Sequence, residues 1–319
     1  MISLEKHTLS APAWQIPGRV TAIHHLESSI VSGQATVVNA SRRTLRPWMR
    51  EFLFIAPVYA LYSVVRNQFG SAHLGVGDAP IHAFNNAVTV IDLEKALGLF
   101  HEVAIQEWFL NTWAVTFFNV FYGTAHFAVT VGVLIWLYVR RHHNFRRWRI
   151  TLMITTALAL AGFALFPLMP PRLLNVSASE NRYGGGELAT AHQLPDYGFV
   201  DTLRHGNGLW NFDTEGMDSI SNQFAAMPSL HIGWSLWCGL ILVNFAKRRS
   251  TKILGALYPI VTLITIVATA NHYIVDAVAG AIILGVGYGI ARVAQALQSR
   301  RHARIHARLH PHVHAVTSS

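Results

Sequence analysis

The stretch NHYIVDAVAGAIILGVGYGIARVA at positions 271–294 decides how this chain folds. Every residue from 277 to 291 is apolar or glycine, and the apolar segment at 273–296 exceeds the about 20 residues that a membrane-spanning helix needs. Two ionisable residues, His272 and Asp276, stand at the start of this stretch. Ionisable residues within a span are costly and indicate function by default. The stretch therefore predicts a membrane helix whose first turn carries a functional site.

The rest of the chain has the same character. Of its 319 residues, 52% are apolar and only 13% are charged, which is typical of a membrane protein. Further apolar segments lie at 52–65, 120–139, 150–169, 230–246 and 253–270. We expect an all-α, polytopic membrane protein with six transmembrane helices. Pro57 interrupts the first segment, for which a buried or interfacial helix is the alternative.

Basic clusters at 42–50, 140–149, 247–252 and 300–308 predict the orientation. All four can lie in the cytoplasm only if both termini are cytoplasmic. The segments 67–110 and 170–228 then lie outside, and we expect a plasma-membrane protein with an extracytoplasmic active site. The net charge of +9 does not predict a nucleic-acid partner, because the cations flank apolar segments and face lipid headgroups.

We predict three parts: a cytoplasmic N-terminal segment at 1–49, a six-helix membrane catalytic domain at 50–298, and a basic cytoplasmic tail at 299–319. In the first outer segment, leucines alternate with glutamates, which predicts an amphipathic helix along the membrane surface. The second contains three consecutive glycines at 184–186 and predicts an irregular loop or lid.

Three stretches place polar residues at the outer ends of helices: PLMPPRLL at 167–174, MPSLHIGWS at 227–235 and NHYIVDAVAG at 271–280. His272 and Asp276 are spaced i, i+4, so the carboxylate can hold one imidazole nitrogen. His231 and Ser229 open a helix whose free N–H groups favour an anion. Arg172 offers a guanidinium fork that suits phosphate oxygens.

Each of these residues has a structural alternative. The His272–Asp276 pair can hold helices together, His231 can be an interfacial polar residue, and Arg172 can anchor a helix end. Together they supply a nucleophile, an orienting carboxylate, a second acid or base and a cationic donor. That combination predicts phosphoryl transfer that needs neither a metal nor a cofactor.

The same residues resemble a known family. PSLH at 228–231 resembles PSGH, the second motif of the type 2 phosphatidic acid phosphatase superfamily, and His272 and Asp276 match the end of its third motif, SRxxxxxHxxxD. The phrases PPR, AMPSLH and NHYIVD resemble its inositol phosphorylceramide synthase branch, which contains inositolphosphotransferases. The resemblance implies that His272 becomes a phosphohistidine, Asp276 orients it, and His231 protonates the leaving group.

Two family motifs depart from their usual form. Leu165 stands where the lysine of KxxxxxxRP would align, and Arg172 is the nearest equivalent of its arginine. Thr265 and Ile266 replace the serine–arginine pair of the third motif. Candidates for the missing cations are Arg66, Arg182, Arg204 and His126. We predict that Tyr122, His126 and Asn271 support the site, with core hydrogen bonding as the alternative for the Tyr122–His126 pair.

The predicted function is therefore that of a lipid-phosphate phosphatase or phosphotransferase. Its donor would be a lipid phosphate or phospholipid, and its acceptor would be water or an alcohol such as a polyol or sugar. The alternative is a lipid transporter or lipid-binding membrane protein that kept the fold and lost the reaction.

Overall fold

The computed structural model describes residues 79–174, 196–205 and 223–309, with isolated positions within 46–60 and 188–191. The chain divides into two compact units, 1–54 and 55–319, and the second contains the elements described below. They are α3 (Ala79–Leu97), α4 (Glu102–Leu110), α5 (Trp113–Arg140), α6 (His142–Leu165), the 3-10 helix η2 (Pro171–Leu174), α8 (Thr202–His205), α10 (Leu230–Phe245), α11 (Arg249–Ala268) and α12 (Ile274–Leu309). The described residues contain no strand beyond a single bridge from Leu168 to Ala225, which confirms the all-α prediction.

Four helices, α5, α6, α11 and α12, are long and apolar enough to cross a membrane. They match the predicted segments 120–139, 150–169, 253–270 and 273–296. The segment at 230–246 forms α10, an apolar helix of 16 residues. At 1.5 Å per residue α10 is about 24 Å long, shorter than a hydrocarbon core of about 30 Å. The first predicted span lies mostly outside the described residues, so the structure supports four spans and not all six.

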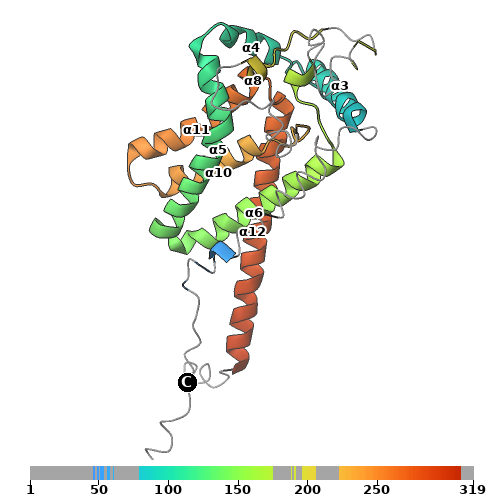
Figure 1. Cartoon of the computed structure of the whole chain (residues 1–319). Helices are drawn as coiled ribbons and strands as arrows, with labels where there is room; N and C mark the ends of the chain where they lie inside the picture. The colour runs from blue at the N-terminus through green and yellow to red at the C-terminus, as the bar shows by residue number, and fades with distance from the viewer. Residues whose placement is uncertain are drawn as a thin grey trace, which may run out of the picture. The chain divides into compact units, whose positions relative to one another are not determined.

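The short helix α10 is the centre of the helical bundle and packs against α5, α6, α11 and α12 (Figure 1). Trp237 is completely buried there and donates a hydrogen bond of 2.8 Å to the carbonyl oxygen of Trp148. Gly239 and Gly255 bring α10 and α11 together, since a Cβ at Gly239 would lie 2.6 Å from the carbonyl oxygen of Gly255. Small residues allow this close approach between membrane helices.

The first outer segment forms two helices, α3 and α4, because Gly98 ends α3 with a φ of +67° that L-residues rarely adopt. A surface-lying amphipathic helix turns its charges to water. The structure differs, because Glu94 and Glu102 are fully buried while Leu93 and Leu97 are 46% and 59% exposed. The side chains of Glu94 and Glu102 therefore face the protein interior at the start of α12.

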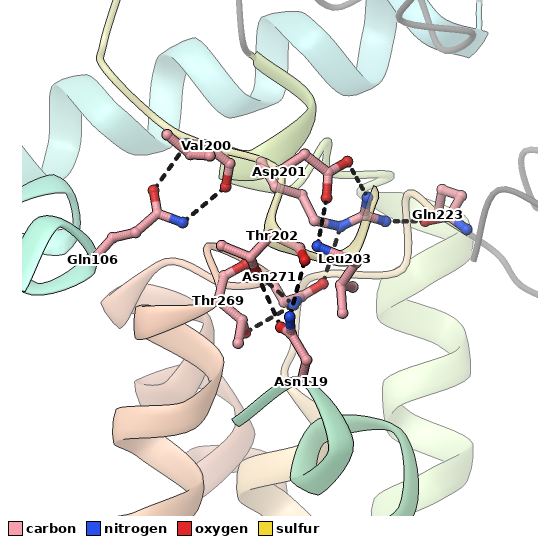
Figure 2. A network of polar contacts seen from close by, with 10 residues as sticks. Gln106, Asn119, Val200, Asp201, Thr202, Leu203, Gln223, Thr269 and Asn271 are labelled. Atoms are coloured by element: carbon pink, nitrogen blue, oxygen red, sulfur yellow. Dashed lines mark hydrogen bonds and ion pairs between the residues drawn. The ribbon is translucent and has the colours of Figure 1, made fainter. Parts of the chain in front are cut away.

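The second outer segment is described in part. A strap, residues 196–203, is fixed by two amide side chains (Figure 2). Gln106 of α4 exchanges hydrogen bonds of 2.8 and 2.9 Å with the backbone of Val200, and Asn119 of α5 makes bonds of 2.9 and 3.0 Å with Thr202. These four hydrogen bonds hold the strap against α4 and α5. The three glycines at 184–186 lie outside the described residues.

Candidate functional site

The turn between α11 and α12 places His272 at the head of α12. The backbone N–H of His272 donates to the carbonyl oxygen of Ile266 at 3.2 Å. The next residue, Tyr273, is fully buried, and its hydroxyl donates to the carbonyl oxygen of Met169 at 3.1 Å. These bonds fix the turn against both α11 and the chain that leads into η2.

His272 lies between a carboxylate and a second histidine. Its Nδ1 is 3.2 Å from Asp276 Oδ2, and its Nε2 is 3.4 Å from Nδ1 of His231. His272 is only 3% exposed and Asp276 is fully buried. A carboxylate beside Nδ1 favours the tautomer that carries its proton there. The arrangement therefore directs the lone pair of Nε2 toward His231.

Ser229 sets the position of His231. Its side chain is the N-cap of α10 and accepts a hydrogen bond from the backbone N–H of Ile232 at 3.5 Å. Its own backbone N–H donates to the carbonyl oxygen of Asp276 at 3.0 Å. Ser229 thus joins the beginning of α10 to the first turn of α12, and its predicted contact with phosphate stays a prediction.

Tyr122 and His126, from α5, both reach His231. The ring of Tyr122 stacks on that of His231 with a centroid distance of 4.3 Å and an interplanar angle of 18°. The ring of His126 lies 4.2 Å from it, and Nδ1 of His126 donates to the carbonyl oxygen of Tyr122 at 3.1 Å. A stacked aromatic ring fixes the orientation of an imidazole. The pair lies beside the candidate site and also makes the local hydrogen bond expected of a core pair.

Arg172 donates hydrogen bonds to three polar side chains, Asn271, Asp201 and Gln223, which Figure 2 labels. Its Nε donates to Oδ1 of Asn271 at 3.0 Å, and one terminal nitrogen donates to Oδ2 of Asp201 at 2.8 Å. The other terminal nitrogen donates to the side-chain oxygen of Gln223. Arg172 is thus bonded to the residue that directly precedes His272, and its cation is held in place by the strap and by the chain before α10.

The departures from the family motifs have clear structural positions. Leu165 is 84% exposed at the end of α6, whereas Thr265 and Ile266 are buried in α11. Arg66 and Arg182 lie outside the described residues, as does the side chain of Arg204. Of the cations predicted to replace the missing ones, His126 is the candidate whose position beside the histidines the structure describes.

Four side chains around the site were not singled out from the sequence: Glu94, Glu102, Asp201 and Gln223. The two glutamates stand among leucines, and a carboxyl group in an apolar segment was the available signal. Asp201 and Gln223 belong to a segment without a recognisable motif, so nothing in the sequence indicated their contact with Arg172. Within the described ranges, no group of three or more His, Cys, Asp or Glu side chains has an arrangement able to hold a metal ion.

The described residues form an apolar helical bundle of the kind found in membrane proteins, with a buried histidine–carboxylate pair beside a second histidine. A family model described as the PAP2 superfamily matches residues 88–290, which is more than half of the chain, and the chain belongs to this superfamily. This confirms the superfamily that PSLH and NHYIVD indicated, while the inositol phosphorylceramide synthase branch stays a prediction. No curated protein and no solved structure matched the chain. Members of the superfamily are phosphatases and phosphotransferases, so membership suggests activity on lipid phosphates in a membrane.

Proposed function

We propose that this protein is a lipid-phosphate phosphatase or phosphotransferase that forms a phosphohistidine at His272. One observation carries the proposal: the two ring nitrogens of His272 face Asp276 and His231, at 3.2 and 3.4 Å. A nucleophile needs one nitrogen held by an orienting group and the other directed at the reacting atoms. In His272, Asp276 holds Nδ1, and Nε2 is the nitrogen that we propose attacks phosphorus, with the proposed acid His231 beside it.

In the first step, Nε2 of His272 attacks the phosphorus of the donor, and an N–P bond forms as the P–O bond to the leaving group breaks. His231, in its protonated form, gives a proton to the departing oxygen. Asp276 keeps its hydrogen bond to Nδ1 and stabilises the positive charge that develops on the ring. The step leaves phosphohistidine and neutral His231.

In the second step, His231 takes a proton from water or from an alcohol, whose oxygen attacks the phosphohistidine. The N–P bond breaks, His272 is restored, and the phosphoryl group leaves on the acceptor. With water the product is inorganic phosphate. With a polyol such as inositol it is a phosphate ester.

Arg172 is proposed to bind the phosphate oxygens through its guanidinium fork, supported by the N-terminus of α10. Asp201 and Gln223 hold the fork before substrate arrives, which reduces the conformational entropy lost on binding. The site lies where the predicted spans end, so the acyl chains of the donor can stay in lipid. We place it on the extracytoplasmic face.

The activity is tested by incubating purified protein with a panel of lipid phosphates and phospholipids, with and without polyol acceptors, and identifying products by mass. His272→Ala should abolish turnover, while His82→Ala, which changes an exposed histidine of α3, should not. Turnover should persist in EDTA, because each proposed step uses side chains alone. Normal turnover by His272→Ala, or loss in EDTA that one metal restores, contradicts the mechanism.

The orientation is tested by labelling intact cells with a membrane-impermeant maleimide. Glu107→Cys lies on an exposed position of α4, and Ser250→Cys lies on one at the start of α11. The native Cys238 is completely buried and serves as the unreactive background. Glu107→Cys should be labelled in intact cells and Ser250→Cys only after permeabilisation. The reverse pattern contradicts an extracytoplasmic site.

A further inference from the structure

The first turn of α12 is held by three carboxyl groups. The N–H groups at the start of a helix have no partner within the helix. Here the N–H of Tyr273 donates to Asp276 Oδ2 at 3.0 Å, that of Ile274 to Glu102 Oε1 at 3.0 Å, and that of Val275 to Glu94 Oε1 at 2.7 Å. Two of the three acceptors therefore come from other helices, α3 and α4.

This capping acts on the same atom that orients His272. Oδ2 of Asp276 lies 3.0 Å from the N–H of Tyr273 and 3.2 Å from Nδ1 of His272. Any displacement of the first turn therefore moves the oxygen that holds the imidazole. The two glutamates accept hydrogen bonds from the next two N–H groups, those of Ile274 and Val275. They therefore fix the position of Asp276 relative to α3 and α4.

Both glutamates are fully buried, which is an expensive position for a carboxylate. Burial, and then the neighbouring carboxyl group of Glu102, raise the pKa of Glu94 from 4.5 to about 9. Tyr273 and Asp276 of the α12 head also carry titratable groups toward it. Lys95 does not offset them, because its ammonium group lies over the rings of Phe100 and Tyr197. A pKa of about 9 favours the protonated, neutral form of Glu94 at neutral pH.

We propose that Glu94 and Glu102 are positioning residues that clamp the first turn of α12 and so keep Asp276 and His272 aligned. The catalytic role of this alignment rests on the proposed phosphoryl transfer. The clamp and the protonation of Glu94 do not depend on that proposed function. A neutral acid at Glu94 accepts the bond from Val275 without adding a second full charge beside Asp276.

The protonation is tested by infrared spectroscopy and by melting curves. The wild type should show the C=O stretching band of a buried carboxylic acid at neutral pH, which Glu94→Gln removes and Glu107→Gln, at the exposed site on α4, retains. Glu94 in the folded protein keeps a proton that the same residue in the unfolded chain releases above pH 4.5. The free energy of unfolding should therefore fall as the pH rises from 4.5 to about 9. Glu94→Gln should flatten this fall. An unchanged band or an unchanged slope overturns the neutral-acid assignment.

The clamp is tested by amide hydrogen exchange at residues 273–276, a readout that does not involve substrate. Exchange should be faster in Glu94→Ala and Glu102→Ala than in the wild type and in the control Glu107→Ala. Unchanged exchange in folded protein overturns the clamp, whether or not the protein acts on lipid phosphates.

The alignment is tested by kinetics. Misplacement by about 1 Å can lower turnover about 100-fold, so both alanine variants should lose kcat on that scale with little change in KM. Glu94→Gln, which keeps a neutral acceptor for Val275, should restore most of the kcat lost in Glu94→Ala. Wild-type kcat in both alanine variants overturns the positioning role. A wild type that turns over no lipid phosphate instead refutes the proposed function, and the exchange and infrared results then stand independently.

Discussion

Gly280 tests whether the close approach of α10 and α12 creates the site. It lies one turn after Asp276, and a Cβ at this position would overlap the carbonyl oxygen of Ser229 and lie 3.2 Å from its carbonyl carbon. Both atoms belong to backbone, so no side chain can rotate away. In Gly280→Ala, the start of α10 must move from α12 by something on the order of 1 Å before an ordinary contact is restored, and such displacements lower turnover about 100-fold.

That movement acts directly on the histidine pair. His231 lies two residues after Ser229, and its Nδ1 is 3.4 Å from Nε2 of His272. The bond of 3.0 Å between the Ser229 N–H and the Asp276 carbonyl would also lengthen. Overpacking of this kind costs about 1–3 kcal/mol of stability, which lowers the melting temperature without unfolding the protein at the assay temperature.

The assay compares kcat for a lipid phosphate with the melting temperature of the same preparation. Gly285→Ala and Gly289→Ala are matched controls, because they lie on the same helix and a Cβ at either position meets nothing within 4 Å. Alanine in their place should raise helix stability by about 0.5–1 kcal/mol. If Gly280→Ala keeps the activity of these controls, the packing of Gly280 against Ser229 does not set the catalytic geometry.

Substitutions at three further positions probe the groups around the histidines. Asp276→Asn should lower kcat by about 10²–10⁴, because an amide no longer fixes the tautomer of His272; a loss below tenfold in folded protein would argue against that role. Arg172→Lys keeps the charge and loses the fork, so KM should rise and the melting temperature should fall; unchanged values would show that the contacts with Asp201 are dispensable. Tyr122→Leu should lower kcat about tenfold and Tyr122→Phe much less, since the phenylalanine ring keeps the stacking on His231; equal effects would assign the role to the hydroxyl.

The sequence predicted those parts of the molecule in which one physical signal dominates. Long apolar segments mark α5, α6, α11 and α12, because a helix that faces lipid must be apolar along most of its length. The spacing of His272 and Asp276 was sufficient to place both on one face, and the structure has them 3.2 Å apart. The sequence predicted α10 at the right residues but as a full membrane span. The structure shows a helix of 16 residues, and a helix surrounded by other helices at the centre of the bundle does not require the length of a full span.

The parts that could not be predicted depend on contacts between distant segments. Glu94 and Glu102 belong to a segment whose leucines suggested a surface helix. They accept hydrogen bonds from backbone N–H groups that lie 181 and 172 residues away in sequence, respectively, at the head of α12. Hydropathy has no information about such a pairing. The partners of Arg172 show the same limit, because Asp201 and Gln223 come from a loop segment in which no periodic pattern marks individual residues.

The central claim is that His272 carries the phosphoryl group. The direct measurement is to mix purified protein with a lipid phosphate labelled at phosphorus, quench within one turnover, and map the label by peptide mass spectrometry. The mechanism predicts an acid-labile, base-stable label on His272 that is absent from His272→Ala and decays when acceptor is added. A label on another residue, or product formed at the normal rate with no labelled protein at any time, would contradict it.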